Sequence, residues 1–366
     1  MLYPKKKEAP NRMGVLPNAT NENAARPFFP VPAPPPPGKT IEIASGVYWL
    51  STFLPFRLRA VNLWLLRDHD GWTMVDCGFP LPEVRRQIEA AWGSVLEGMP
   101  IRRLVVTHHH PDHVGNCRWI CERWGIVPTM TLQERDQSKV LLGTRWDDSS
   151  RERIEFWRRH GLTEDEAVAV NRNFGSHREL FVAPPEKWNQ ILDGDVLRIG
   201  EADWKVVVAS GHTFEQALLY SREGNLLISG DQVLAQITPN VSVRFDDPEA
   251  DPLTQFLESN RRIARICGDA MVLPSHKLPF IGLQERIKAI ERHHEERLEV
   301  IERELRGRPC TAASLIPALF GDPKELTGHD IAFALGESLS HLHYLVSQGR
   351  AATLEKNSEM VFVALG

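Results

Sequence analysis

Hydrophobic positions in the first half of the chain occur in short runs that are typical of β-strands. Three such runs, rich in β-branched and aromatic residues and separated by turn residues, cover residues 46–54, 60–68 and 71–78. Residues 81–92 instead carry hydrophobic side chains at helical spacing, and "IRRLVVTH" (101–108) predicts a buried strand. Residues 115–125 predict a helix that ends at Gly125. The pattern so far is strands, helix, strand, helix.

Residues 133–185 break this rhythm, because they are charged and have a helical pattern. We interpret them as a helical insertion that caps another part of the molecule. Strand patterns resume between residues 195 and 231, and a helix (252–267) and a short strand (270–276) follow. Most strands follow one another without a crossover helix. The order therefore favours an α+β fold, a four-layer αββα sandwich, over a doubly wound sheet.

The two ends of the chain differ from this body. Residues 1–38 contain the proline-rich run "RPFFPVPAPPPPGK", which predicts an extended arm lying on its own domain or on a partner subunit, anchored by Phe28 and Phe29. Residues 281–366 contain three helix patterns and two short terminal strands, which predict a small winged-helix-like module. The predicted domains are therefore the arm, a central domain (39–280) and the C-terminal module.

Composition narrows the class of protein further. The formal net charge of −5 provides no basic field for nucleic acid or anionic membranes. The five cysteines lack framework spacing, which favours a reducing compartment, and the charged N-terminus lacks the apolar segment of a secretory signal. No apolar stretch reaches the roughly 18 residues that would span a membrane. We therefore predict a cytoplasmic protein without a membrane span.

The densest polar group in the sequence is "VVTHHHPDHVGN" (105–116), which directly follows a predicted strand. His108 and His110 are two positions apart, so both rings can point to the same side, whereas His109 should point to the opposite side. A chance cluster of core histidines is the plain alternative. So many polar side chains cannot be buried together without partners, however, and imidazole is a standard zinc ligand. The run therefore predicts a metal site.

The second half of this run can serve a second metal. Asp112 and His113 follow Pro111, where we expect the chain to turn, so their side chains can aim at a point a few ångströms away. Gly115 leaves room for the next helix to start close by. One short loop can therefore offer nitrogen and oxygen ligands to two metal ions.

Two metal ions need more ligands than this loop holds. Three further candidates lie at the ends of predicted strands, directly before turns: His212 in "SGHT", Asp231 in "SGDQ" and His276 in "PSHK". A dinuclear hydrolytic site requires a bridging carboxylate, and Asp231 suits this role. Coordination would lower the pKa of a bridging water toward neutrality, so that hydroxide becomes available as the nucleophile.

The motif "THHHPDHVGN" resembles the T-H-x-H-x-D-H-x-G signature of the metallo-β-lactamase superfamily, and "GHT", "SGD" and "LPSH" follow in the family's order. The resemblance covers roughly residues 40–300. It implies a dinuclear site with these ligands: His108, His110 and His212 for one metal, Asp112, His113 and His276 for the other, and Asp231 as the bridge. It implies two zinc ions, although iron or manganese would also suit this ligand set.

The resemblance also assigns roles around the metals. Asp76 in "VDCG" matches an aspartate that orients the ligand loop in this family. Thr107 and Thr213 flank ligands in the matching motifs and are expected to support them. Asp112 and Asp231 are the candidates for taking a proton during hydrolysis.

The complete ligand set narrows the activity that the resemblance implies. β-Lactamases of this fold use cysteine or another arrangement in place of a bridging aspartate, so Asp231 argues against antibiotic hydrolysis. Glyoxalase II-like hydrolases carry the full ligand set. The resemblance therefore implies a small ester-like substrate, and a thioester of glutathione or coenzyme A is the first expectation. Lactonases and nucleases of the fold carry it too. The C-terminal module is similar to that of the β-lactamase-like protein 2 branch, which cleaves single-stranded RNA. A lactonase and a metal-dependent endoribonuclease are therefore the alternatives.

Other reactive residues are interpreted as structural. Cys117 and Cys121 lie four positions apart on one helix face, which favours core packing over a redox pair. Helical histidines outside the motifs are interpreted as interface or solvated residues: His293, His294, His341 and His343. The C-terminal module has slightly more acidic than basic residues, which argues against nucleic acid and favours packing on the central domain or a homodimer. The intact ligand set argues against a partner-binding scaffold with a vestigial site.

Lys277 departs from the family pattern, in which glycine commonly follows the last histidine. The substitution adds a cation beside the predicted site, where it could contact an anionic substrate or be solvated.

Overall fold

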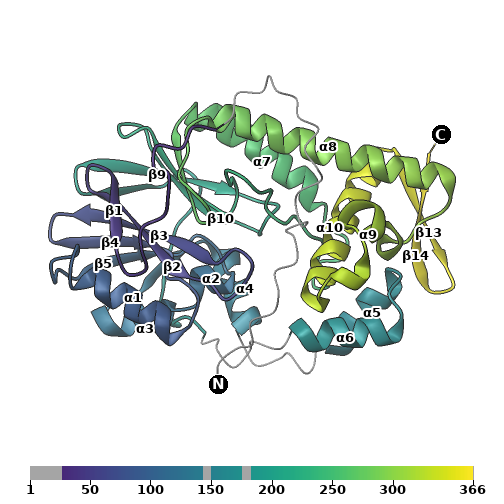
Figure 1. Ribbon diagram of the computed structural model, residues 1–366, viewed down its shortest axis with the longest axis horizontal. Coiled ribbons are helices and arrows are strands. Elements are labelled where there is room, and N and C mark those ends of the chain that lie inside the picture. The colour runs from purple at the N-terminus through teal and green to yellow at the C-terminus, as the bar shows by residue number, and fades with distance from the viewer. Residues whose placement is uncertain (1–26, 143–149, 175–182, 366) are drawn as a thin grey trace.

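The computed structural model describes residues 27–142, 150–174 and 183–365, so most of the predicted N-terminal arm lies outside the described residues. Figure 1 shows a lobe that contains nearly all of the strands beside a mainly helical lobe that contains the C-terminus. The long helix α8 (Leu283–Gly307) runs along both lobes and joins them.

Two mixed sheets form the β-rich lobe. The first sheet has seven strands in chain order, antiparallel from β1 to β4 and parallel from β4 to β7. Its strands are β1 (Thr40–Ala44), β2 (Val47–Phe53), β3 (Ala60–Asp68), β4 (Gly71–Val75), β5 (Ile101–Val105), β6 (Pro128–Met130) and β7 (Asn189–Gln190). The second sheet has five strands in the order β12-β11-β10-β9-β8, of which β11 and β12 are parallel. These are β8 (Val196–Ile199), β9 (Ala202–Ala209), β10 (Gln216–Ser221), β11 (Leu226–Gly230) and β12 (Met271–Pro274).

Helices cover the outer faces of both sheets, so the predicted four-layer αββα sandwich is confirmed. Trp49, Trp64 and Trp204 are among the buried side chains that fill the space between the sheets. Helices α1 (Pro82–Trp92) and α3 (Cys117–Trp124) cover the first sheet, and α7 (Pro252–Cys267) covers the second. Cys117 and Cys121 are buried in the core under α3, which agrees with the packing interpretation.

Most predicted elements are present, and the missed ones are short. Strands β6 and β7 have three and two residues, which is too few for an alternating pattern to be recognised. Strand β1 is an edge strand without a fully buried side chain, so its hydrophobic pattern is weak. These strands extend the first sheet at its two edges and do not change the predicted architecture.

The C-terminal lobe is a small domain of helices and one hairpin, as predicted. After α8 come α9 (Ala312–Phe320), η2 (Pro323–Glu325), α10 (Gly328–Ser347), β13 (Ala351–Lys356) and β14 (Glu359–Ala364). The hydrophobic face of α8, including Ile287, Ile290 and Leu298, is buried. It shares one core with α7, α9 and α10, so the lobe packs directly against the second sheet's helical layer.

The helical insertion contacts both lobes. Helix α4 (Leu132–Leu142) directly follows β6, whereas α6 (Glu164–Phe174) packs against α10 and against α5 (Ser150–Arg159), and α5 also contacts β14. Figure 1 shows α5 and α6 beneath the C-terminal lobe. The insertion therefore caps the C-terminal domain; its residues 143–149 and 175–182 lie outside the described residues.

The described part of the arm lies on its own chain. The backbone of Phe28 pairs with that of Ile281, directly before α8, with N···O distances of 3.0 and 2.9 Å. The Phe29 side chain packs against the core, while Phe28 is 63% exposed. Of the two predicted anchors, Phe29 therefore acts through its side chain and Phe28 through its backbone.

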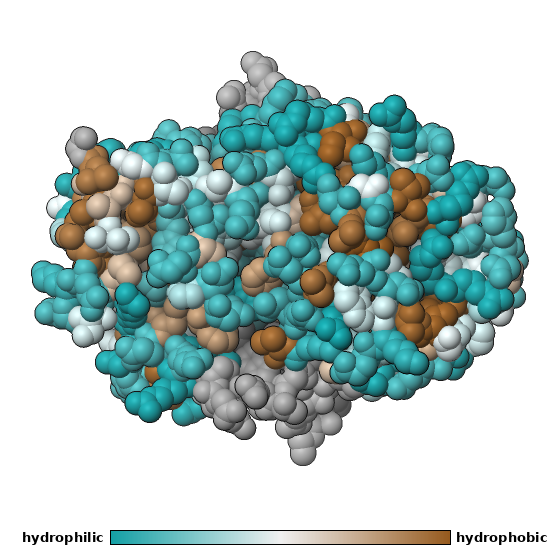
Figure 2. Space-filling model, turned by 180° about the vertical axis from the view of Figure 1, so that it is seen from behind, coloured by the Kyte–Doolittle hydropathy of each residue, from teal (hydrophilic) through white to brown (hydrophobic). Residues whose placement is uncertain are grey.

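The surface is mixed in character. Figure 2 shows a largely hydrophilic face on which hydrophobic residues gather in separate patches. Among the residues that the structure describes, no helix is long and apolar enough to cross a bilayer. The cytoplasmic location and the homodimer remain predictions.

Candidate metal centre

The ligand loop leaves strand β5 at Val105 and enters a one-turn helix, α2 (Pro111–Val114). The sequence led us to expect the chain to turn at Pro111, and it does so as one turn of helix: the proline occupies the first helical position, where its missing N–H costs nothing. Gly115 is required here, because a Cβ atom would lie 2.3 Å from the Pro111 carbonyl oxygen and 2.4 Å from Pro80 Cδ. The helix still directs Asp112 and His113 toward one point.

The structure brings all seven predicted ligands together in two groups. His108, His110 and His212 form the first position with Asp231, and Asp112, His113 and His276 form the second. Within each group the potential ligand atoms lie within 4.8 Å of one another. In the first position, His108 Nε2 and His110 Nδ1 are 3.0 Å apart.

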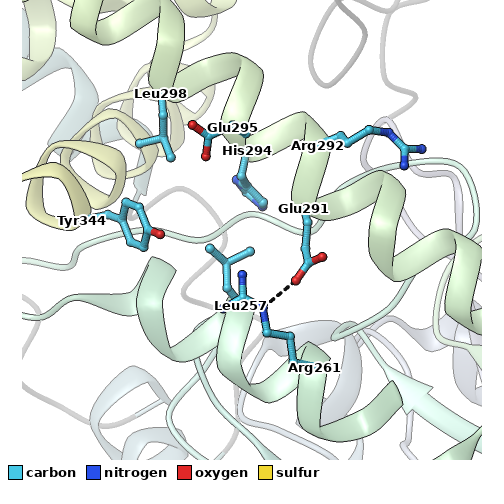
Figure 3. A pocket seen from close by; sticks show the side chains of 8 residues that line it. All are labelled: Leu257, Arg261, Glu291, Arg292, His294, Glu295, Leu298 and Tyr344. Carbon is cyan, nitrogen blue, oxygen red and sulfur yellow. Dashed lines mark hydrogen bonds and ion pairs between the residues drawn. The ribbon is translucent and has the colours of Figure 1, made fainter. Parts of the chain in front are cut away.

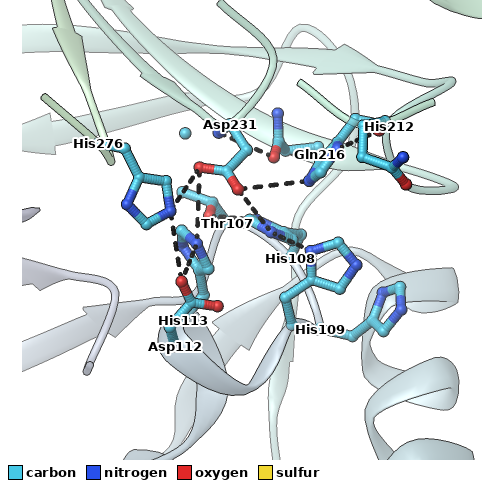
Figure 4. A network of polar contacts seen from close by, with 12 residues as sticks. Thr107, His108, His109, Asp112, His113, His212, Gln216, Asp231 and His276 are labelled. Atoms are coloured by element: carbon cyan, nitrogen blue, oxygen red, sulfur yellow. Dashed lines mark hydrogen bonds and ion pairs between the residues drawn. The ribbon is translucent and has the colours of Figure 1, made fainter. Parts of the chain in front are cut away.

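Asp231 lies between the two positions, with one carboxylate oxygen toward each. Its Oδ2 is 3.4 Å from His212 Nε2 and 3.9 Å from His108 Nε2. Its Oδ1 is 3.5 Å from His276 Nε2 and 3.7 Å from His113 Nε2. Figure 4 shows this carboxylate between His276 on one side and His212 on the other. The arrangement suits a bridging ligand.

The donor atoms fit metal ions because several of them are buried without another partner. Four such atoms lack a hydrogen bond within the described parts of the chain: His113 Nε2, His212 Nε2, His276 Nε2 and Asp231 Oδ1. Buried polar atoms are almost always paired, so a group of unpaired ones that converge indicates a ligand. Imidazole nitrogens and carboxylate oxygens are donors that zinc prefers.

Burial keeps two imidazoles of the first position, those of His108 and His110, neutral. It lowers the pKa of His108 and of His110 well below the ordinary value, and the neighbouring imidazoles lower both further. Neutral imidazole is the form that binds a metal. His108 and His110 are therefore ready to coordinate a cation without releasing protons.

Carboxylates dominate the second position. Burial would lower the pKa of His113, but Asp112, Asp76 and Asp231 outweigh it and raise the pKa well above the ordinary value. Burial would also lower the pKa of His276, but Asp231 and Asp112 outweigh it and raise this pKa to about 10. Burial would raise the pKa of Asp231, but His276 and His113 hold it well below the ordinary value. The second position thus attracts positive charge strongly.

Asp76 holds the ligand loop from behind, as the sequence predicted. Its Oδ1 accepts a hydrogen bond from the Thr107 N–H at 2.7 Å, and its Oδ2 accepts from Thr107 Oγ1 at 2.9 Å and from His113 Nδ1 at 2.8 Å. Bonding at Nδ1 leaves His113 Nε2 free to coordinate. Asp76 has φ 62°, and Asp is one of the few residue types that adopt this left-handed conformation readily. Thr213 contributes through its backbone, because its carbonyl accepts from the Gly211 N–H at 2.9 Å and closes the turn around His212.

Residues of strand β3 hold His276 in place, and the sequence did not reveal this support. His276 Nδ1 lies 2.9 Å from the Ala60 carbonyl oxygen. The Asn62 amide donates to the carbonyls of Pro274 and Lys277, each at 2.9 Å, and so fixes the chain on both sides of His276. Lys277 has φ 66°, which explains why glycine suits this position.

The C-terminal domain reaches the first position through Asn240. His212 Nδ1 is 2.8 Å from the Asn240 carbonyl oxygen, and the Asn240 amide donates to Glu337 Oε2 of α10 at 3.2 Å. Glu337 Oε1 lies 3.2 Å from Arg297 Nη1 of α8, and Arg297 is nearly fully buried. A metal ligand of the sandwich is therefore oriented by a loop that two C-terminal helices hold.

His109 points away from both positions, as predicted, and both of its ring nitrogens have hydrogen-bond partners. Its Nδ1 lies 2.5 Å from Glu134 Oε2, and its Nε2 accepts a hydrogen bond from Arg244 Nη1 at 2.9 Å. Neither partner was predicted, and a lone glutamate 25 positions along the chain offers no local signal.

The pocket in Figure 3 is separate from the candidate ligands. It lies between α7, α8 and α10 and has a volume of about 220 Å³. His294 lines it, fully buried, with Nδ1 3.1 Å from His341 Nε2. Both histidines belong to the helix interface, as predicted. His293 is not solvated but partly buried, and accepts a hydrogen bond from Arg297 Nε at 3.0 Å.

Comparison with known proteins identifies two family models in the chain. Residues 56–276 match the metallo-beta-lactamase superfamily, and this segment includes all seven candidate ligands. Residues 298–363 match the family described as metallo-beta-lactamase-like, C-terminal domain. The predicted family resemblance is thereby confirmed for both parts of the chain.

Individual relatives support the same assignment. A crystal structure of a beta-lactamase domain protein from Burkholderia ambifaria superposes with a TM-score of 0.85 and 36% identity over 93% of this chain and 98% of that one. The probable metallo-hydrolase YqjP of Bacillus subtilis is 23% identical over 80% of this chain and 90% of its own. The acyl-coenzyme A thioesterase MBLAC2 of Gallus gallus is 26% identical over 52% of this chain and 64% of its own.

Proposed function

The chain belongs to the metallo-beta-lactamase superfamily and is a metal-dependent hydrolase. On this basis we propose that it hydrolyses a small thioester, and that a thioester of coenzyme A or glutathione is the first candidate substrate. The observation that carries the proposal is the position of Asp231, whose two oxygens face two different groups of ligands. That geometry suits a dinuclear hydrolytic centre. The similarity to an acyl-coenzyme A thioesterase supports the choice of thioester.

The residues present would hold two zinc ions at the two positions. When bound, such ions polarise a carbonyl group and lower the pKa of a shared water toward neutrality. His108, His110 and His212 would hold one ion, Asp112, His113 and His276 the other, and Asp231 both. Iron and manganese would suit the same ligands.

Asp112 is the better of the two candidates for moving a proton. Its side chain is 17% exposed, against 11% for Asp231, and it contacts other ligands only at the second position. Asp231 faces ligands with both oxygens, which leaves it less free to exchange a proton. Asp112 would accept the proton of the attacking water and deliver it to the departing thiolate.

The test is a metal analysis followed by a substrate panel on one preparation. We expect about two equivalents of metal and hydrolysis of coenzyme A or glutathione thioesters, with turnover abolished in His110→Ala and Asp231→Ala. Lactones, phosphodiesters and single-stranded RNA complete the panel and test the two alternatives. Hydrolysis by metal-free protein at the wild-type rate would overturn the mechanism, and cleavage of RNA or lactones alone would overturn the substrate.

A further inference from the structure

Glu134 connects the two segments that carry the histidines of the first position. Its side chain is fully buried at the start of α4. Oε2 accepts from the backbone N–H of His109 at 3.0 Å and lies 2.5 Å from His109 Nδ1. Oε1 accepts from the Glu215 N–H at 2.7 Å. One carboxylate therefore ties the loop between His108 and His110 to the turn that follows His212.

His109 is held on its other side as well. Its Nε2 accepts from Arg244 Nη1, so the proton of this imidazole lies on Nδ1 and is donated to Glu134. Arg244 is itself fixed by Asp246, to which it donates at 2.8 and 2.9 Å, and it lies over the ring of Phe214. The residue between two metal ligands thus has its backbone N–H and both ring nitrogens bound. Its rotation would move His108 and His110.

We propose that Glu134 is a positioning residue for the first metal position, setting the separation of His110 from His212 through His109 and Glu215. The inference rests on the proposed dinuclear centre. Glu134 acts on the first position indirectly, because its partners His109 and Glu215 lie beside His108 and His110 and three residues after His212. The second position is held by Asp76, which binds His113 Nδ1. The second position should therefore not depend on Glu134.

The competing explanation is that Glu134 merely anchors α4. Thr131, in the same segment, also donates to the Glu215 carbonyl, at 2.8 Å, so a purely structural attachment is present. An anchor would change the stability of the protein and leave the relative affinity of the two metal positions unaltered. A positioning residue would change one metal affinity selectively, because partners that orient ligands typically affect metal binding about 10–100-fold.

The experiment is a zinc titration of metal-free Glu134→Gln against a chromophoric chelator, with both dissociation constants fitted. We expect one constant to weaken about 10–100-fold and the other to change less than about threefold. His212→Ala and His276→Ala identify which constant belongs to which position. Glu186→Gln is the matched control, because Glu186 is 81% exposed and pairs with Lys139 away from the centre; its constants should be unchanged.

A second variant keeps the test decisive if Glu134→Gln does not fold. Arg244→Met leaves the Glu134 contacts in place but frees His109 Nε2, and should weaken the same constant to a smaller extent. Unchanged constants in the variant that folds, or equal weakening of both constants, would overturn the inference. The zinc titration needs no substrate. Two tight zinc sites in a protein that does not hydrolyse thioesters would therefore overturn the proposed substrate and leave the role of Glu134 open to this test. Wild-type protein that binds fewer than two zinc ions would overturn both.

Discussion

The two candidate metal positions use similar ligands but are held by different parts of the molecule. The second position is supported from within the first sheet, where Asp76 follows β4 and Ala60 begins β3. The first position shares this support, because the Oγ1 atom of Thr107, which Asp76 binds, lies 3.0 Å from His108 Nδ1. It is also supported from outside the sheets, by Glu134 of the insertion and by Asn240, whose loop α10 holds. The sandwich alone can therefore build the second position, whereas the first depends on the sandwich and also on the parts added to it.

The two positions also differ in charge. Burial keeps His108 neutral, while nearby carboxylates overcome burial and favour the protonated form of His113 and His276. A metal entering the second position must displace protons, whereas His108 and His110 of the first position can bind a metal without losing one. Similar ligands thus acquire different binding properties from their surroundings.

The largest expected effect comes from the residue that the positions share. Asp231→Ala should remove a ligand from both positions, so bound metal should fall from two equivalents to below one. Turnover should fall at least about 100-fold, because even residues that only orient metal ligands contribute about 10–100-fold. Elemental analysis and thioester kinetics measure the two effects. Asp203→Ala, an exposed residue paired with Arg198, is the control. Retention of two tightly bound metals would show that Asp231 does not bridge.

The pH dependence of metal binding should separate the positions next. The pKa of His276 is raised to about 10 and that of His113 is raised well above its usual value, so both are protonated at pH 7 in the metal-free protein. Raising the pH toward 10 removes the competing protons, so affinity at the second position should rise about tenfold per pH unit for each proton displaced. The lowered pKa values of His108 and His110 predict that these two ligands release no proton, so affinity at the first position should depend less steeply on pH. Calorimetry in buffers of different ionisation enthalpy counts the protons; equal release from both positions would contradict the comparison.

Removing the support of the second position should have an intermediate effect. Asp76→Asn keeps the shape but not the charge that holds His113 Nδ1 and Thr107. We expect zinc affinity at the second position to weaken about 10–100-fold. The first position should weaken less, because Asp76 reaches its ligand His108 only through Thr107. The chelator titration measures both constants. A loss confined to the first position would reverse the assignment.

The smallest expected effect comes from the C-terminal domain. Glu337→Gln weakens the contacts with Arg297 and with Asn240, the residue that binds His212. Zinc affinity at the first position should therefore fall about tenfold, which is the low end of the range for residues that orient metal ligands. Arg297 would remain buried with a weaker partner, so urea unfolding should show a loss of stability of up to about 3 kcal/mol. Equal weakening of both metal constants would show that the domain stabilises the protein without orienting His212.

The seven candidate ligands and the sandwich could be predicted from the sequence alone. The reason is local: the strands show an alternating pattern, and each ligand lies at the end of a predicted strand or in the loop that follows it, at an edge where strand ends meet. The grouping of ligands came from family resemblance. The motif also indicated correctly that His109 faces away from its neighbours.

Only the tertiary structure decided how the ligands are held. The orientation of Asp231, the contact of Glu134 with His109, and the connection of Glu337 to Asn240 join residues that are far apart in the chain. Such contacts leave no periodic or local signal, because any buried glutamate looks the same in the sequence as an exposed one. The sequence by itself determined which side chains could bind two metals, and the packing of the insertion and the C-terminal domain on the sandwich determined how differently the two are supported.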